Sequence, residues 1–142
     1  MSSPELTSAD DESTDPLLRV SAYRLSLDLL EAAKRDASAM LKHPLSKKQA
    51  DQLYRAVASI GANLAEGYSR SSGRDRVRFL EYALGSAREC RHWYRAALVA
   101  LPRDQVAPQQ RLLNRICKLI MTTIPPERAR LIRKERTDVS PD

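Results

Sequence analysis

The apolar residues of the chain recur every three or four positions over four long stretches, which is the spacing of amphipathic helices. In the first stretch they are Leu18, Ala22, Leu25, Leu29, Ala33 and Met40. Asp15-Pro16 supplies a cap residue followed by a proline that suits the first helical position. His43-Pro44 stops the pattern, because the residue before a proline avoids the helical region. The pattern therefore predicts a helix that starts between residues 16 and 21 and ends near Lys42.

Capping signals introduce the next two helices. Ser46-Lys47-Lys48-Gln49 and Ser72-Gly73-Arg74-Asp75 each match a capping box. The helix after the first box carries the apolar stripe Leu53, Val57, Ile60, Leu64 and Tyr68. It is predicted to stop at Gly67, and the helix after the second box to run to about Leu101, where a proline follows.

A fourth helix is predicted from near Pro108 to Ile124, where Pro125-Pro126 is expected to end it. No segment alternates with period two for long enough to be a strand. Four helices of similar length with short loops predict an all-α fold, an antiparallel up-down-up-down four-helix bundle over residues 16–124. Residues 125–142 are predicted to be a basic C-terminal tail that holds one short helix.

Composition and charge divide the chain into an acidic N-terminal arm and a basic body. The 142 residues suit one domain, and the formal net charge is +6. Residues 1–16 hold five acids and no lysine or arginine, so the remainder is more basic than the total implies. Residues 1–15 are predicted to be a disordered acidic arm, because they offer almost nothing to bury. A basic body with such an arm predicts a polyanion partner, or an arm that competes with one, so that deleting the arm would tighten binding.

The compartment is predicted to be the cytoplasm. No apolar run approaches the roughly 20 residues that span a bilayer, and the polar N-terminus does not resemble a signal peptide. Cys90 and Cys117 are the only cysteines. Both lie on apolar helix faces and are expected to be reduced core thiols.

Arginines gather on the third predicted helix and on the loop before it. Residues 70–95 contain seven arginines and no lysine. Those expected to contact a nucleic acid are Arg70, Arg74, Arg78, Arg88, Arg91 and Arg95. A guanidinium group matches phosphate and carboxylate in bidentate geometry, so this face predicts a track for the phosphate backbone. The other interpretation is a solvated face whose arginines pair with acids of the same subunit.

Glu66 stands one residue before Gly67, where the negative end of the helix dipole disfavours an acid. The short loop that follows predicts that Glu66 accepts hydrogen bonds from Arg70, Arg74 or the free amides of the next helix. Asn63 lies one turn earlier and is expected to join it. These residues with Gly67 are interpreted as a structural corner rather than a catalytic site.

Nothing in the sequence predicts catalysis, a cofactor or a metal site. His43 and His92 are the only histidines, and they lie on different elements. One Glu-x-x-His occurs at Glu89–His92 without the second copy that a di-iron bundle needs. The chain is therefore predicted not to be an enzyme.

RAVASIGANLAEGYSR, followed by FLEYALGSARE, resembles the four-helix-bundle proteins named after the intervening sequences of bacterial large-subunit ribosomal RNA genes. The matching positions are Ser59-Ile60, 63–68, Phe79-Leu80, 83–86 and Glu89, and the resemblance covers roughly residues 17–124. It implies an antiparallel bundle that often forms a homopentamer. The resemblance extends to the related accessory proteins of diversity-generating retroelements, which are basic pentamers that bind nucleic acid and a reverse transcriptase. Gly85, inside this motif, is expected to allow close approach of a neighbouring helix.

Two functions remain open at this point. The first is a non-enzymatic, homo-oligomeric accessory protein that binds RNA or DNA through the arginine face and assists a reverse transcriptase or an RNA-related process. The alternative is a protein-interaction scaffold, whose arginines serve contacts between subunits or with a partner such as a polymerase. In the second case arginine substitutions would break the assembly rather than a nucleic-acid contact.

Overall fold

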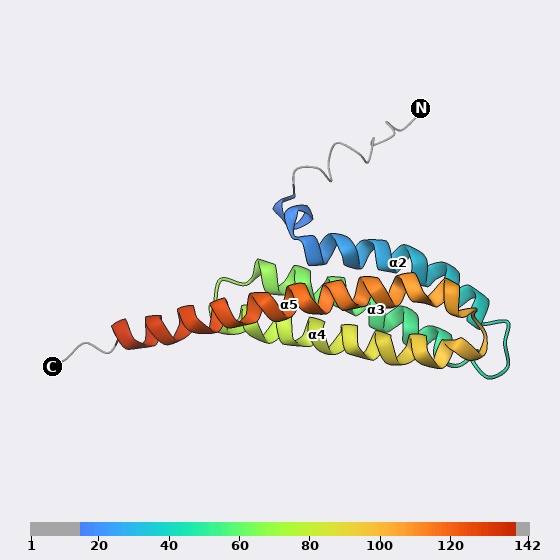
Figure 1. Cartoon of the computed structure of the whole chain (residues 1–142). Coiled ribbons are helices and arrows are strands. Elements are labelled where there is room, and N and C mark those ends of the chain that lie inside the picture. Colours follow the sequence, from blue (N-terminus) through green and yellow to red (C-terminus); the bar gives the residue numbers. More distant parts are fainter. Residues whose placement is uncertain (1–14, 139–142) are drawn as a thin grey trace, which may run out of the picture.

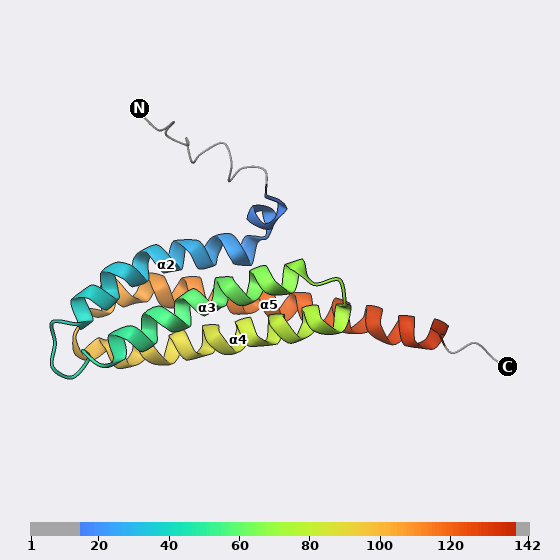
Figure 2. The ribbon, with the colours of Figure 1, turned by 180° about the vertical axis from the view of Figure 1, so that it is seen from behind.

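The computed structural model describes residues 15–138 and confirms the antiparallel four-helix bundle (Figure 1). Its elements are η1 Pro16–Arg19, α2 Ser21–Met40, α3 Gln49–Ser69, α4 Gly73–Ala96, η2 Ala97–Val99 and α5 Arg103–Asp138. Each long helix packs against the next, and α5 returns to lie against α2, so the bundle closes (Figure 2). Apart from Asp15, the predicted acidic arm lies outside the described residues.

The first turn forms at the predicted proline, but it is separate from the first long helix. The side chain of Asp15 accepts a hydrogen bond from the amide of Leu17 at 2.9 Å and caps η1. Val20 then adopts an extended conformation, with φ −78° and ψ 110°, and α2 begins at Ser21. The cap signal was therefore correct for a short 3₁₀ turn rather than for the long helix.

The two predicted capping boxes have different outcomes. Ser72 caps α4, since its hydroxyl accepts a hydrogen bond from the amide of Asp75 at 3.4 Å. The box at Ser46 is wrong: its buried hydroxyl donates to the carbonyl of Met40 at 2.8 Å, and α3 begins after Lys48 without a side-chain cap. The carbonyl of Met40 also accepts from the amide of His43 at 3.2 Å, so Ser46 adds a second hydrogen bond at the buried end of α2.

The predicted end of the last helix at Ile124 is also wrong. The helix α5 begins at Arg103 and continues through Pro125-Pro126 to Asp138, 36 residues in all. The carbonyls that lose a partner to these prolines belong to Met121 and Thr122, which are exposed and open to water. The helix thus tolerates prolines that would break a buried one.

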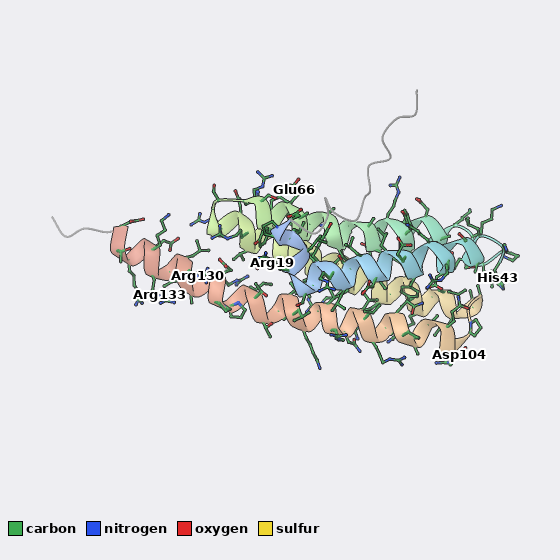
Figure 3. The ribbon with its side chains drawn as sticks, turned by 90° about the horizontal axis from the view of Figure 1, so that it is seen from above. Arg19, His43, Glu66, Asp104, Arg130 and Arg133 are labelled. Carbon is green, nitrogen blue, oxygen red and sulfur yellow. The ribbon has the colours of Figure 1, made fainter. Side chains whose placement is uncertain are left out.

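The end of α5 projects beyond the other helices (Figure 3). Arg130 and Arg133 lie on the projecting part, at the end of the molecule away from His43 and Asp104. Leu131 holds the start of this segment against α4, because its Cδ2 lies 3.0 Å from a Cβ placed on Gly73. The four helices are consequently unequal in length, whereas the sequence pattern predicted similar ones.

The core runs along the bundle axis and is rich in alanine. Its larger members, all nearly inaccessible to solvent, are Leu29, Met40, Leu53, Ile60, Tyr94, Leu113, Ile116 and Ile120. Within the subunit, no described residue makes the predicted close approach at Gly85, since Gly85 is exposed and a Cβ there would meet nothing within 4 Å. Helices approach closely at Gly67 instead, where a Cβ would lie 3.0 Å from that of Phe79. Within residues 15–138, no helix is both long enough and apolar enough to cross a bilayer.

Candidate functional site

The arginines predicted to bind nucleic acid divide into two groups along α4. We call Arg70, Arg74 and Arg78 the acid-paired arginines, because each forms an ion pair with a carboxylate of the same subunit. We call Arg88, Arg91 and Arg95 the open arginines, because none of them takes part in an ion pair within residues 15–138. The sequence-based prediction placed all six arginines on one track, whereas the structure divides them by whether they pair with an acid.

Two of the acid-paired arginines enclose one aromatic ring. Arg70 contacts Glu66 at 3.1 Å, and Arg78 contacts Asp75 at 3.1 Å. Their guanidinium carbons lie 5.1 and 5.4 Å from the centre of the Phe79 ring. Each cation therefore has both a carboxylate and a ring face as partners, which leaves less of its charge for an external ligand.

The C-terminal half of α5 supplies acids to the start of α4. Arg74 pairs with Glu135 at 3.0 Å. Arg76 lies 3.6 Å from Glu127 and also donates to the carbonyl of Ser71 at 2.9 Å. The sequence-based interpretation missed these pairs because it ended the last helix before Glu127. Both acids then fell in a tail whose place relative to α4 was not predicted.

The three residues of the predicted corner have separate partners. Glu66 accepts a hydrogen bond from Arg70, whereas Arg74 turns to α5. Asn63 donates to the carbonyl of Ser59 at 2.8 Å, along its own helix. Gly67 provides the close approach to Phe79. Nothing in these contacts brings an acid and an amide to a shared point.

The open arginines lead into a cleft between α4 and the first turns of α5. The cleft has a volume of about 630 Å³. Its lining is Arg91, Arg95, Leu98, Arg103, Val106, Ala107, Gln110, Arg111 and Asn114. Four of these side chains are guanidinium groups and none is an acid. A concave surface of one charge sign concentrates counter-ions, so this cleft suits an anion.

Two of the four cleft arginines were missed from the sequence. The fourth helix was predicted to begin near Pro108, so Arg103 had no place on a helix face. The observed start of α5 brings Arg103 and Arg111 to the side that faces Arg91 and Arg95. Arg88 lies outside the cleft lining, with its guanidinium 3.9 Å from the sulfur of Met121.

The family model for 23S rRNA-intervening sequence proteins matches residues 19–122. The chain belongs to this family. Its fold is similar to a crystal structure from Bacteroides thetaiotaomicron, described as a protein with unknown function from the S23 ribosomal protein family. The TM-score is 0.68 at 23% identity, over 73% of this chain and 95% of that one. The comparison with curated proteins gives no match.

The chemistry of this family member's thiols does not favour catalysis. Burial raises the pKa of the Cys90 thiol well above its ordinary value. Burial also raises the pKa of Cys117, although the nearby Arg91 and Arg88 act in the opposite direction. Both cysteines are free and buried, so neither provides the accessible thiolate that a nucleophile requires.

No candidate metal centre accompanies the cleft. Within residues 15–138, no group of three or more His, Cys, Asp and Glu side chains is placed to hold a metal ion.

Proposed function

We propose that this protein is a non-enzymatic accessory protein that binds nucleic acid through the phosphate backbone. The observation that carries the proposal is the cleft, in which Arg91, Arg95, Arg103 and Arg111 line one concavity without a carboxylate. Phosphate contacts of this kind fix the position of a nucleic acid and release condensed counter-ions. Because the family is named after ribosomal RNA intervening sequences, RNA is the first probe to use.

The contact surface is narrower than the full arginine face. Arg70, Arg74 and Arg78 would have to give up a carboxylate before they could bind a phosphate. The open arginines carry no such cost. We therefore assign the contact to Arg88, Arg91 and Arg95 together with the two cleft arginines of α5.

The protein is further proposed to act as a cytoplasmic homo-oligomer, a pentamer by family resemblance. Gly85 supports a subunit contact on the outer face of α4. A glycine inside a helix costs about 1 kcal/mol relative to alanine, and no neighbour within the subunit uses the space at Gly85. A ring of subunits would present several copies of the cleft to one strand and raise its affinity through avidity.

A specific observation also supports the alternative of a protein-interaction scaffold. Tyr82 lies one turn before Gly85 on α4 and is 52% exposed. Tyrosine is enriched in protein interfaces, so this face fits another protein chain. In this alternative the arginines serve contacts between subunits or with a partner protein such as a polymerase, with a reverse transcriptase as the first candidate by resemblance.

One experiment separates the two functions. The full chain is purified with and without nuclease treatment, its native mass is measured, and its binding to labelled RNA is titrated at several salt concentrations. The proposal predicts co-purifying nucleic acid, and an affinity that falls linearly on a log–log scale as salt increases. An oligomer of constant mass that carries no nucleic acid and does not bind RNA or DNA at low salt would instead support the scaffold.

A further inference from the structure

We infer, resting on the proposed function, that the cleft between α4 and α5 takes an unpaired nucleotide, so that the protein prefers single-stranded nucleic acid to duplex. In this arrangement the arginines at the rim hold phosphates, and the base lies on the apolar floor. The inference deepens the proposed function because backbone binding alone makes no distinction between one strand and two.

The floor of the cleft is the first reason. It contains Leu98 and Ala107, which are partly exposed, and Val106, which is almost fully buried and adds little surface of its own. Aliphatic side chains offer nothing to a phosphate. They suit the flat face of a base, which gains from leaving water. In a duplex that face is already stacked between its neighbours, whereas a single strand can turn a base outwards.

The rim of the cleft is the second reason. Arg91 and Arg95 stand on α4, and Arg103 and Arg111 stand on α5. A guanidinium group can bind a phosphate or stack its plane on a base, and arginine serves both purposes in single-strand recognition. The cleft lining contains no aromatic residue, so the base would stack on the guanidinium planes and the aliphatic floor.

Two amide side chains complete the lining. Gln110 donates a hydrogen bond from Nε2 to the carbonyl of Arg91 at 3.3 Å, which ties it to α4. A primary amide has a second N–H and a carbonyl oxygen, so Gln110 keeps polar groups for the edge of a base. Asn114 adds another amide one turn further along α5. The Watson–Crick edge of a base is free for such contacts only when the base is not paired.

The experiment compares two labelled probes with the full chain: an unstructured single-stranded RNA of about 20 nucleotides and a blunt duplex that contains the same sequence. Fluorescence anisotropy is recorded over a range of salt concentrations. We expect the single strand to bind about tenfold tighter, in line with the stacking of one or two bases. A duplex that binds as tightly as the single strand, or more tightly, would overturn the inference.

Substitutions test whether the preference for single strands arises in the cleft. Ala107→Leu fills the floor and leaves every arginine in place, so single-strand affinity should fall about tenfold while duplex affinity stays constant. Ala96→Leu, at an exposed position of α4 outside the cleft lining, is the matched control and should change neither. Asn114→Ala alters an exposed side chain, cannot disturb the core, and should lower single-strand affinity a few-fold. Equal losses for both probes would refute the assignment to the floor.

The two proposals fail in different ways. Salt-dependent binding of both probes with equal affinity would reject the single-strand preference and leave the phosphate-binding function standing. Absence of binding to either probe at low salt would reject both.

Discussion

The hydroxyl of Tyr94 on α4 donates a hydrogen bond to Oδ2 of Asp36 on α2 at 2.7 Å, across the core of the bundle. Gln105 and Gln109, both on α5, donate to the same carboxylate at 2.8 Å. Asp36 is only 2% exposed, so its charge is balanced by these three donors rather than by water. One side chain thus joins three of the four helices and fixes their positions along the axis.

Replacing Tyr94 by phenylalanine should destabilise the protein without opening the core. The change removes one of three donors to a buried carboxylate, and a hydrogen bond to a charged group contributes about 1.5–3 kcal/mol. Urea unfolding of the full chain measures the loss. Tyr82→Phe, which removes an exposed hydroxyl, is the control and should change stability by less than about 0.5 kcal/mol. Equal stabilities of the two variants would show that the Asp36 hydrogen bonds do not stabilise the bundle.

The stability of the protein should depend on the ionisation of Cys90 in alkali. Burial holds the pKa of this thiol above its ordinary value of 9.0. Above pH 9.0 the unfolded chain loses the proton while the folded chain keeps it, so the unfolded state is favoured as pH rises. Each such group steepens the fall by up to about 1.4 kcal/mol per pH unit. Below pH 9.0 the Cys90 thiol keeps its proton in both states and does not make stability depend on pH.

Cys90→Ala should therefore reduce the fall in stability above pH 9.0 and leave the pH dependence below it unchanged. Urea unfolding of the wild type and the variant at a series of pH values measures the two profiles. Profiles that stay parallel across this range would show that the thiol ionises equally in both states, contrary to its burial.

The sequence predicted the bundle because apolar spacing and caps act locally. The stripe from Leu53 to Leu64 and the cap at Ser72 required no knowledge of the rest of the chain. Gly85 was misjudged because a helical glycine has the same local signal whether or not another helix lies beside it. Partners distant in sequence, such as Arg74 and Glu135, could not be predicted while Pro125-Pro126 was interpreted as a stop.

The candidate site was predictable in part for the same reason. Arginines at positions 88, 91 and 95 share a helix face by spacing alone, so their side of α4 could be stated in advance. The cleft could not be predicted without the observed start of α5, which places Arg103 and Arg111 opposite these arginines. The pairs of Arg70 with Glu66 and of Arg78 with Asp75 follow from local helical spacing. The pair of Arg74 with Glu135 depends on the three-dimensional fold, and no local pattern predicts it.

Two neighbouring arginines of α4 should differ in their effect on stability because their ion pairs differ in burial. The Arg76 and Glu127 side chains are 33% and 16% exposed, whereas those of Arg74 and Glu135 are 80% and 63% exposed. Arg76→Ala should cost about 2 kcal/mol, since it removes the more buried of the two cations that pair with Glu127, Arg130 being the other, together with the Arg76 hydrogen bonds to two loop carbonyls. Arg74→Ala should cost less than about 1 kcal/mol. Thermal unfolding measures both, and a larger loss at Arg74 would contradict the burial argument.

The two glycines should respond in opposite ways to alanine. Gly67→Ala places a Cβ 3.0 Å from that of Phe79, so α3 and α4 must separate and the protein should lose stability. Gly85→Ala meets nothing within 4 Å in the subunit and should gain up to about 1 kcal/mol. Urea unfolding midpoints of the two variants measure both changes in the stability of the subunit. Native mass tests the subunit contact, because an alanine at a tight interface should weaken the oligomer.

The most direct test of phosphate binding by the open arginines compares two triple variants of equal charge. One changes Arg88, Arg91 and Arg95 to glutamate, and the other changes the acid-paired Arg70, Arg74 and Arg78. RNA affinity is measured against salt concentration, with native mass recorded for each variant. We predict that the first variant loses at least about a hundredfold in affinity and most of its salt dependence, while the second loses less than about tenfold. Equal losses in the two variants, or a greater loss in the second, would contradict the assignment of binding to the open arginines.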